Sequence, residues 1–433
     1  MKYYLDTASS STKTCCFEAE IKRHDSFLSV DSNATVITVQ DNKPSQYGSI
    51  HEEQETVMIK QQQCSTMGGA VNLVNAMMGT GIIGLPLALH LCGFWLGLLF
   101  SVTIAYISCM TMHITILCGL KTQTHSLVSL CQSLIGSTGA LLGDTLPSLL
   151  ALAFPNVPFF SDRRNVILAF GLLCTLPLSL SRSTAQFAKW SAMSVCLLML
   201  MLLGVLVRVP YYLSIVDKIE LEYVPISESM FKGLAIISLA FGCSQNLFGV
   251  YSGLKNQSPS KWLLTCSTAI GIAFVINIVF AVTAYLCFGK HVQANILLNF
   301  PENDPGIQLV KLALGLFMVL TIPLCIHPCR ESVMMMFGIN THNSTNKQHY
   351  TVSIGVFALI LWVGATITSL GKVFNVIGGF STTILGFLLP GCAYLYLFSS
   401  ELLNNKKLFF VSIFSICIAL PVMYFSIKDA IFK

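Results

Sequence analysis

The chain has 433 residues, of which 54% are hydrophobic and only 10% are charged. A soluble domain carries about a quarter charged residues, so this composition excludes an ordinary water-soluble globular protein. The formal net charge of +5 comes without a long basic block, which gives no support to nucleic-acid binding. Repeated apolar runs of about 20 residues predict an all-α, polytopic helical membrane protein.

Residues 1–65 are rich in Ser, Thr, Gln, Asn and charged side chains. A segment this polar buries too little apolar surface to offset the entropy lost on ordering, so we predict a disordered cytosolic tail. The tail lacks the apolar core of a signal peptide. Residues 66–430 form the predicted transmembrane domain.

Ten segments of that domain are apolar and long enough to be expected as membrane helices. They are residues 68–91, 94–118, 165–181, 187–207, 232–253, 262–288, 307–329, 351–370, 373–398 and 408–427.

Residues 126–160 are only mildly apolar and contain Asp144, prolines and glycines, so we expect a shortened or atypical region there. If this region holds one crossing, basic residues such as Lys255 and Lys406 fall on the side of the tail. Two long acidic loops then fall on the opposite side of the membrane. We prefer this topology because it places those acidic loops outside the cytosol.

Two of the predicted spans contain glycine-rich interruptions, at Asn72–Leu89 and at Ser238–Tyr251. Each interruption opens a set of about five spans, as is typical of membrane proteins built from two inverted repeats. The first set, residues 68–207, is shorter than the second, residues 231–399, by roughly one helix with its loop. The shortfall coincides with the atypical region.

The first interruption, NLVNAMMGTGIIGLPLAL, combines Asn72 and Asn75 with the triplet Gly79, Thr80 and Gly81. An unwound turn at the triplet exposes backbone N–H and C=O groups, which is tolerable inside a membrane only where something polar binds them. The helix N-terminus after the break favours a carboxylate, and the Asn75 amide oxygen suits a small hard cation. The alternative is that these small residues only let helices pack closely.

The second interruption places Ser244, Gln245 and Asn246 consecutively in the centre of a predicted span. Successive helical residues point about 100° apart, so the three side chains cannot all face one partner helix. We therefore expect the chain to unwind around a cavity, with a polar contact between helices as the alternative.

A third motif, LTIPLCIHPCR, places Thr321 next to Pro323, which removes a helical hydrogen bond and releases carbonyl oxygens. The Thr321 hydroxyl supplies another oxygen for a cation. His327 is a candidate proton relay, but an interfacial histidine is the simpler interpretation. No P-loop, nucleophile elbow, HExxH or CxxC motif is present, so we expect no enzyme and no cofactor.

The Asn72–Leu89 motif resembles the first helix of the amino acid/auxin permease family, and within it the sodium-coupled neutral amino acid transporters. FGCSQNLFGVYSGL, LTIPLCIHPCRE and GDTL, which begin at Phe241, Leu320 and Gly143, match the same family further along. The resemblance covers about residues 66–400. It implies a leucine-transporter-like fold of eleven helices, the first ten in inverted repeats of five.

The resemblance also implies symport of a neutral amino acid with sodium by alternating access, in the plasma membrane or an endolysosomal membrane. Asn75 and Thr321 match the family's sodium-linked positions. The amino acid lies against the two breaks, for which we expect Asn72, Gly79, Thr80, Gly81, Ser244, Gln245 and Asn246 as substrate-binding residues.

Two departures from the family pattern keep other functions open. Ser244 stands where relatives commonly carry histidine, and the third helix is not recognisable between LVSLCQSL and GDTL. The alternatives are a proton-coupled amino acid transporter of an acidic organelle, and a non-transporting amino acid sensor or inactive splice variant.

Overall fold

The structure, a computed structural model, describes residues 64–79, 81–135, 175–180, 184–213, 227–301, 303–337, 339, 344–366, 370–399 and 405–432. All regular elements within these residues are helical, apart from one isolated backbone bridge. Most of the predicted tail, the part of the atypical region after Ile135 and most of the predicted span 165–181 lie outside the described residues.

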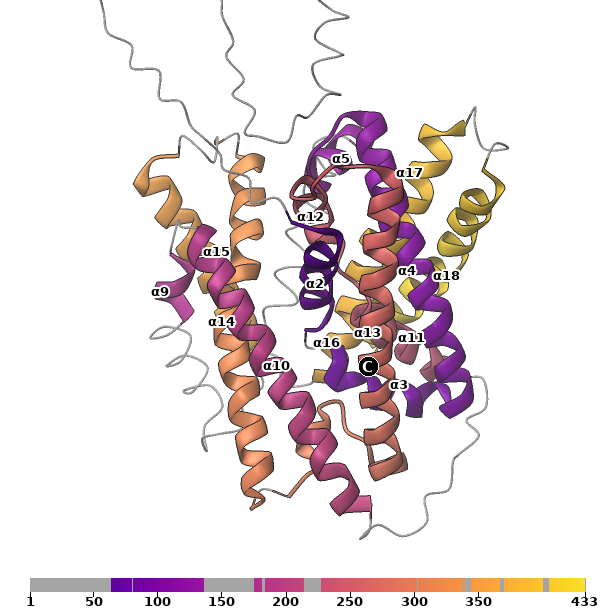
Figure 1. The fold of residues 1–433 in the computed structure, drawn as a ribbon, viewed down its shortest axis with the longest axis vertical. Coiled ribbons are helices and arrows are strands. Elements are labelled where there is room, and N and C mark those ends of the chain that lie inside the picture. Colours follow the sequence, from indigo (N-terminus) through magenta and orange to yellow (C-terminus); the bar gives the residue numbers. More distant parts are fainter. Residues whose placement is uncertain are drawn as a thin grey trace, which may run out of the picture. The chain divides into compact units, whose positions relative to one another are not determined.

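The α-helices (Figure 1) are α2 (Thr66–Met77), α3 (Gly81–Cys92), α4 (Phe94–Thr122), α5 (Leu127–Ile135), α9 (Leu176–Ser179), α10 (Thr184–Leu213), α11 (Glu228–Ala240), α12 (Leu247–Ser252), α13 (Pro259–Phe288), α14 (Pro305–Met336), α15 (Asn346–Thr366), α16 (Leu370–Val376), α17 (Leu389–Leu397) and α18 (Lys406–Phe432). Three 3₁₀ turns occur at η3 (Ser244–Asn246), η4 (Gly289–His291) and η5 (Ile296–Leu298). Between α16 and α17 the chain forms two π-helical segments, η6 (Ile377–Thr382) and η7 (Ile384–Leu388).

Within the described residues, seven helical stretches are long and apolar enough to cross a membrane, and the bent pair of α2 and α3 is an eighth candidate. The expectation of an all-helical polytopic membrane protein is therefore confirmed. The predicted span 351–370 corresponds to α15, which is a helix but is not among these eight. Large apolar side chains on outward surfaces, such as Trp95, Val207, Phe410 and Tyr424, are exposed as lipid-facing residues would be.

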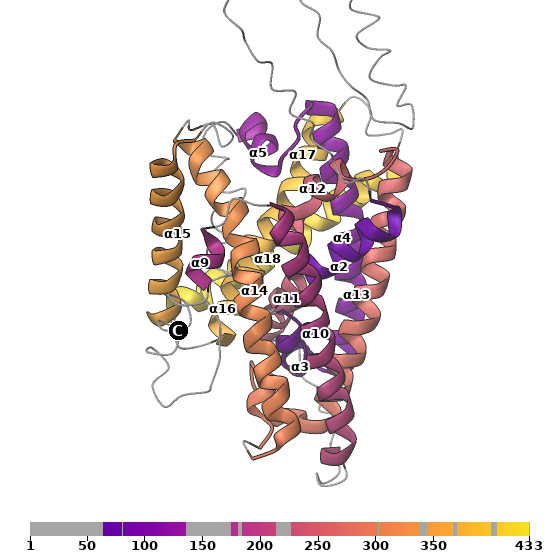
Figure 2. The same ribbon diagram turned by 60° about the vertical axis from the view of Figure 1, so that its left-hand side comes forward.

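The helices pack in two groups. In the first group, α3 lies along α11, and α13 packs on α2, α3 and α4. In the second, α10 and α14 form the most extensive pair, and α14 also packs against α15 and α9. Figure 2 shows α10 and α14 side by side with α15 beyond them. A contact between α10 and α13 joins the two groups.

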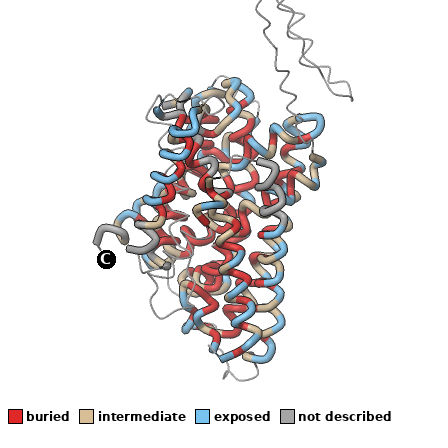
Figure 3. Tube along the Cα trace, turned by 90° about the vertical axis from the view of Figure 1, so that its left-hand side faces the viewer, coloured by how far each residue is buried: buried red, intermediate tan, exposed pale blue. Residues whose placement is uncertain are grey.

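The main hydrophobic core fills the first group and continues between α10 and the first half of α14. Its largest fully buried side chains include Trp262, Phe241, Phe280 and Tyr285. A smaller cluster, containing Ile326 and Phe357, joins α14 to α15. Figure 3 shows the buried residues gathered on the inward sides of the helices and the exposed residues along the outside.

Local sequence determines several helix boundaries. The Ser65 hydroxyl accepts a hydrogen bond from the Gly68 N–H at 3.2 Å and so caps α2. Ser258 caps α13 in the same way, and Pro259 occupies the first helical position. Gly93 has φ of 79°, a conformation that suits glycine, and this allows the sharp turn from α3 into α4.

Candidate functional site

The first break separates α2 from α3, and the two helices are bent by 65°. The Met78 N–H still bonds the Val74 carbonyl at 2.8 Å, whereas the Gly79 N–H turns back to the Met77 carbonyl at 2.9 Å. A Cβ added to Gly79 would meet no atom within 4 Å, so this residue borders open space. Thr80 lies outside the described residues. The helix is therefore interrupted where the sequence predicted it.

The second break follows α11, which ends at Ala240, while α12 begins at Leu247. Between them Cys243 has an extended φ of −149°, and Ser244–Asn246 form a single 3₁₀ turn. Ser244 and Gln245 are half-buried and Asn246 is exposed, so the three polar side chains do not share one face. This part of the prediction, unwinding in the middle of the span, is confirmed.

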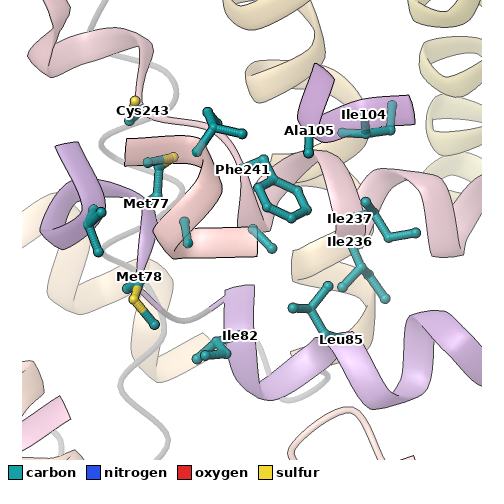
Figure 4. Packing of buried hydrophobic residues seen from close by; sticks show 14 of the residues in the cluster. Met77, Met78, Ile82, Leu85, Ile104, Ala105, Ile236, Ile237, Phe241 and Cys243 are labelled. Carbon is teal, nitrogen blue, oxygen red and sulfur yellow. The ribbon is translucent and has the colours of Figure 1, made fainter. Parts of the chain in front are cut away.

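The two breaks meet at Gly81, the first residue of α3. A Cβ at Gly81 would lie 3.0 Å from the Ala240 Cα and 3.1 Å from its nitrogen. Only glycine allows the start of α3 to come this close to the end of α11. Figure 4 shows side chains from both breaks, including Met77, Ile82 and Phe241, in the same hydrophobic cluster.

A buried asparagine that the sequence analysis did not single out supports the second break. Asn277 of α13 is 1% exposed, and its Nδ2 donates to the Ala240 carbonyl at 3.3 Å. Its Oδ1 and the hydroxyl of Ser238 are buried without a hydrogen-bond partner. Such atoms are uncommon in folded proteins and indicate a place for water or a ligand. The signal in the sequence was one asparagine within a strongly apolar span.

A small cavity lies beside the second break, between α4, the unwound chain and the π-helical segments. Its volume of about 10 Å³ holds roughly one water molecule. The lining residues are uncharged: Ser108, Thr111, Met112, Thr115, Phe241, Gly242, Cys243, Ser244, Leu247, Thr382, Gly386 and Phe387. Of the predicted substrate residues that the structure describes, only Ser244 borders this cavity.

The π-helical segment η6 packs closely against α11. A Cβ at Gly378 would lie 2.0 Å from the Ala235 carbonyl oxygen, so no other residue fits without moving the backbone. A Cβ at Gly242 would meet Thr382 at 2.3 Å. Irregular π-helical turns often mark functional sites, and this one abuts the interrupted helix.

The predicted sodium ligands lie in different surroundings. Asn75 of α2 is half-buried. Thr321 of α14 is also half-buried, and its hydroxyl donates to the Phe317 carbonyl at 2.8 Å, which leaves the oxygen able to accept. Helix α2 packs mainly on α13 and α12, and α14 mainly on α10 and α15. A sodium site that combines the two residues stays a prediction.

Two other predicted residues, Asn72 and His327, are not seen at the breaks in the part of the chain that the structure describes. Asn72 is exposed on α2, next to the exposed Val71. His327 lies within α14, but its side chain is outside the described part of the chain. Close to it in sequence, the buried Arg330 donates to the Ser179 carbonyl at 3.3 Å, which anchors α14 to α9.

An ion pair joins the ends of α10 and α14. Arg208 donates to the Asp304 carboxylate, and the Tyr212 hydroxyl donates to the same carboxylate at 2.6 Å. Burial raises the pKa of Asp304, but the bonds from Tyr212, Arg208 and two backbone N–H groups outweigh it and hold this pKa below its usual value. Asp304 lies in the acidic loop between the predicted spans 262–288 and 307–329, and the sequence alone does not show that it is buried.

Comparison with known proteins gives one family match that covers nearly the whole membrane region. The family described as "Transmembrane amino acid transporter protein" matches residues 62–142 and 122–432. Similar proteins include "Putative sodium-coupled neutral amino acid transporter 11" of Rattus norvegicus, 27% identical over 79% of this chain and 81% of that protein. "Vacuolar amino acid transporter 2" of Saccharomyces cerevisiae is 24% identical over 83% of this chain and 82% of that protein.

Among solved structures, a Na⁺-coupled sialic acid symporter in a substrate-bound outward-open state is 10% identical over 84% of this chain and 97% of that chain. Its TM-score of 0.37 is too low to support a detailed superposition. The family match confirms the resemblance found in the Asn72–Leu89 motif and excludes an enzyme. The chain belongs to the family of transmembrane amino acid transporters.

Proposed function

We propose that this protein carries neutral amino acids across a membrane together with sodium, by alternating access. The observation that carries the proposal is the meeting of two interrupted helices, with Gly81 of α3 against Ala240 of α11. Backbone groups released at both breaks then face one location. Discontinuous helices of this kind hold substrate and coupling ions near the middle of the membrane in many transporters.

The electrostatics of the breaks suit an amino acid zwitterion. The N-terminus of α3 presents unbonded N–H groups and a positive dipole end, which favour a carboxylate. The C-terminus of α11 presents a negative dipole end beside it, which favours an ammonium group. The described residues around the small cavity at the second break are uncharged, so no charged partner for a substrate side chain stands among them.

Oxygen atoms suitable for sodium are available on three helices, α2, α13 and α14. Asn75 and Thr321 are the ligands that the family resemblance assigns, and the unpartnered Oδ1 of the buried Asn277 adds an amide oxygen at the end of α11. A membrane potential of about −70 mV supplies roughly 1.6 kcal/mol per sodium ion. A sodium concentration gradient adds to this, so one ion can drive modest accumulation of substrate.

The second candidate is proton-coupled transport in an acidic organelle. It is favoured by the similarity to vacuolar amino acid transporters of two yeasts, the second being "Vacuolar amino acid transporter 5" of Schizosaccharomyces pombe, 26% identical over 76% of this chain. The membrane in which the protein acts, plasma membrane or endolysosomal, depends on which candidate is correct.

Uptake into proteoliposomes tests the proposal directly. Purified full-length protein is reconstituted, and labelled neutral amino acids are supplied under an inward sodium gradient or an inward proton gradient. Uptake with sodium alone supports the symporter, and uptake with protons alone supports the second candidate. Binding of amino acid without uptake under either gradient would contradict both and identify a sensor.

A further inference from the structure

Three hydroxyl groups line the small cavity at the second break. Ser108 comes from α4, Ser244 from the 3₁₀ turn η3, and Thr382 from the π-helical segment η6. These elements are far apart in the sequence, so only the fold brings the three hydroxyls together. Among the residues that the structure describes, none of the three has a hydrogen-bond partner, although a hydroxyl can both donate and accept.

The unpartnered hydroxyl of Ser108 is the exception on its own helix. Ser108 is 3% exposed, so its hydroxyl has lost the hydrogen bonds that bulk water would supply. Other buried hydroxyls of α4 are satisfied within the helix. That of Ser101 donates to the Gly97 carbonyl and that of Thr115 donates to the Thr111 carbonyl, both at 2.8 Å. The difference indicates that a partner for Ser108 enters the cavity from outside the protein chain.

The walls of the cavity leave room for one small neutral group. A Cβ at Gly242 would be 2.3 Å from the methyl carbon of Thr382, so the break and η6 are in close contact there. A Cβ at Gly386 would be 3.6 Å from the Ser244 hydroxyl oxygen, so a larger residue would fill the space beside it. The free volume of about 10 Å³ holds a group of the size of one water molecule. A hydroxyl group has this size and can bond to all three side chains.

The cavity adjoins the place where the proposed substrate binds. Phe241 forms part of its wall and directly follows Ala240, which is the residue that Gly81 of α3 contacts. An amino acid held by its carboxylate and ammonium groups at the two breaks can therefore extend a short side chain into the cavity.

We propose that this cavity is the side-chain subsite of the transporter and selects amino acids with a hydroxyl on the β carbon, L-serine being the best fit. The inference rests on the proposed transport function, because it names the substrate class of that same site. The serine hydroxyl completes the hydrogen bonds of Ser108, Ser244 and Thr382. Alanine lacks only this hydroxyl and leaves the three groups buried and unpaired. A site that bonds a substrate hydroxyl discriminates strongly against the analogue without it.

Uptake of labelled L-serine and L-alanine into proteoliposomes that hold the full-length protein tests the subsite. The measured quantity is the ratio of two uptake efficiencies, the maximal rate divided by KM for serine and the same quotient for alanine. The ratio cancels differences between variants in the amount of folded protein. For the wild type we expect a ratio of at least about tenfold in favour of serine.

Two pairs of variants show whether the cavity hydroxyls produce this ratio. Ser108→Ala should lower the ratio severalfold, because it slows serine uptake and leaves alanine uptake unchanged. Its matched control is Ser101→Ala, which removes an equally buried hydroxyl of α4 outside the cavity and should keep the wild-type ratio. Thr382→Val keeps the shape of the side chain and should also lower the ratio, whereas Thr382→Ser keeps the hydroxyl and should not. A wild-type ratio in both Ser108→Ala and Thr382→Val would overturn the subsite.

The subsite and the proposed transport function can fail separately. Equal efficiencies for serine and alanine in the wild type would overturn the subsite and leave transport standing. If neither amino acid is taken up under a sodium or a proton gradient, transport is rejected and binding decides the subsite. A rise in the unfolding temperature with L-serine but not with L-alanine would then support it, and equal or absent shifts would overturn it.

Discussion

The two groups of helices differ in how continuous their backbones are. In the first group, α2 and α3 are the halves of one interrupted span, and α11 and α12 are the halves of another. In the second group, α10 and α14 run for 30 and 32 residues without a gap. The interrupted helices expose backbone groups to a ligand, whereas the continuous helices bond most of theirs internally, apart from those released at prolines such as Pro323 of α14.

The difference extends to the contacts that hold each group. The interrupted helices meet at Gly81, which lies against Ala240, and the π-helical segment η6 meets α11 at Gly378, which lies against Ala235. The continuous pair is joined by packed apolar side chains and by Asp304, which binds both Arg208 and Tyr212. Close glycine contacts let backbones slide and turn, while the partly buried ion pair of Arg208 and Asp304 favours one arrangement. Alternating access needs both properties, a jointed part and a rigid support.

A larger side chain at the contact between the two breaks should lower uptake more than any other change considered. Gly81→Val places side-chain carbons against the Ala240 backbone, which must shift and carry the second break with it. We expect uptake to fall about 100-fold, since a displacement near 1 Å at a substrate site has an effect of this size. The matched control is Gly271→Val in α13, where a Cβ meets nothing within 4 Å. Uptake by the control should change less than about twofold, and equal losses in both variants would mean that the breaks are not the site.

The coupling ion gives the next largest expected effect. Asn75→Ala and Thr321→Ala each remove one proposed oxygen ligand, so we expect each to raise the half-saturating sodium concentration about tenfold, or 1.4 kcal/mol. Thr321→Ser keeps the hydroxyl and should stay near the wild-type value. The measurement is uptake against sodium concentration, with thermal unfolding as the check that the variants are folded. Unchanged sodium dependence in both alanine variants would remove the proposed site.

The sequence predicted the class of protein and both helix breaks because these depend on local composition. Glycines and consecutive polar residues weaken a helix within an apolar span whatever packs around it, as Gly79 and Ser244 illustrate. The family match covers residues 62–142 and 122–432 and so includes the Asn72–Leu89 motif. These are the features that a single segment of chain determines by itself.

What the sequence left unpredicted depends on contacts between distant segments. Asn277 is one asparagine in an apolar helix, and only the fold shows that it holds the end of α11. The cavity at the second break is lined by hydroxyl groups of α4, such as that of Ser108, and by Thr382 of η6. No local sequence pattern shows that these residues lie together. The isolated backbone bridge between Cys64 and Leu254 likewise joins two segments that show no strand pattern of their own.

Replacing the buried Asp304 tests whether the ion pair makes the α10 and α14 pair rigid. Asp304→Asn leaves Arg208 with a weaker partner, and we expect the free energy of unfolding to fall by about 1–3 kcal/mol. The matched control is Glu228→Gln, because Glu228 pairs with Lys428 at 2.6 Å in an exposed position. An exposed pair contributes roughly 0–1 kcal/mol, so this variant should unfold almost like the wild type. Equal losses, measured by thermal unfolding in detergent, would contradict the assignment of rigidity to the α10 and α14 pair.

The smallest expected effect is the pH dependence of the same contact. Because the hydrogen bonds hold the pKa of Asp304 below its usual value, the folded state binds this proton less readily than the unfolded chain does. The stabilisation is therefore complete above the unfolded value, near pH 4, and is lost only as the pH falls through the lower folded value. The difference in unfolding temperature between wild type and Asp304→Asn should stay constant from about pH 7 to pH 5 and shrink below about pH 4. A difference that already shrinks between pH 7 and pH 5 would show that the contact of Asp304 with Arg208 and Tyr212 is lost in an acidic organelle. A constant difference means that α10 and α14 remain joined at either candidate membrane, so that any dependence of transport on pH in this range arises at other groups.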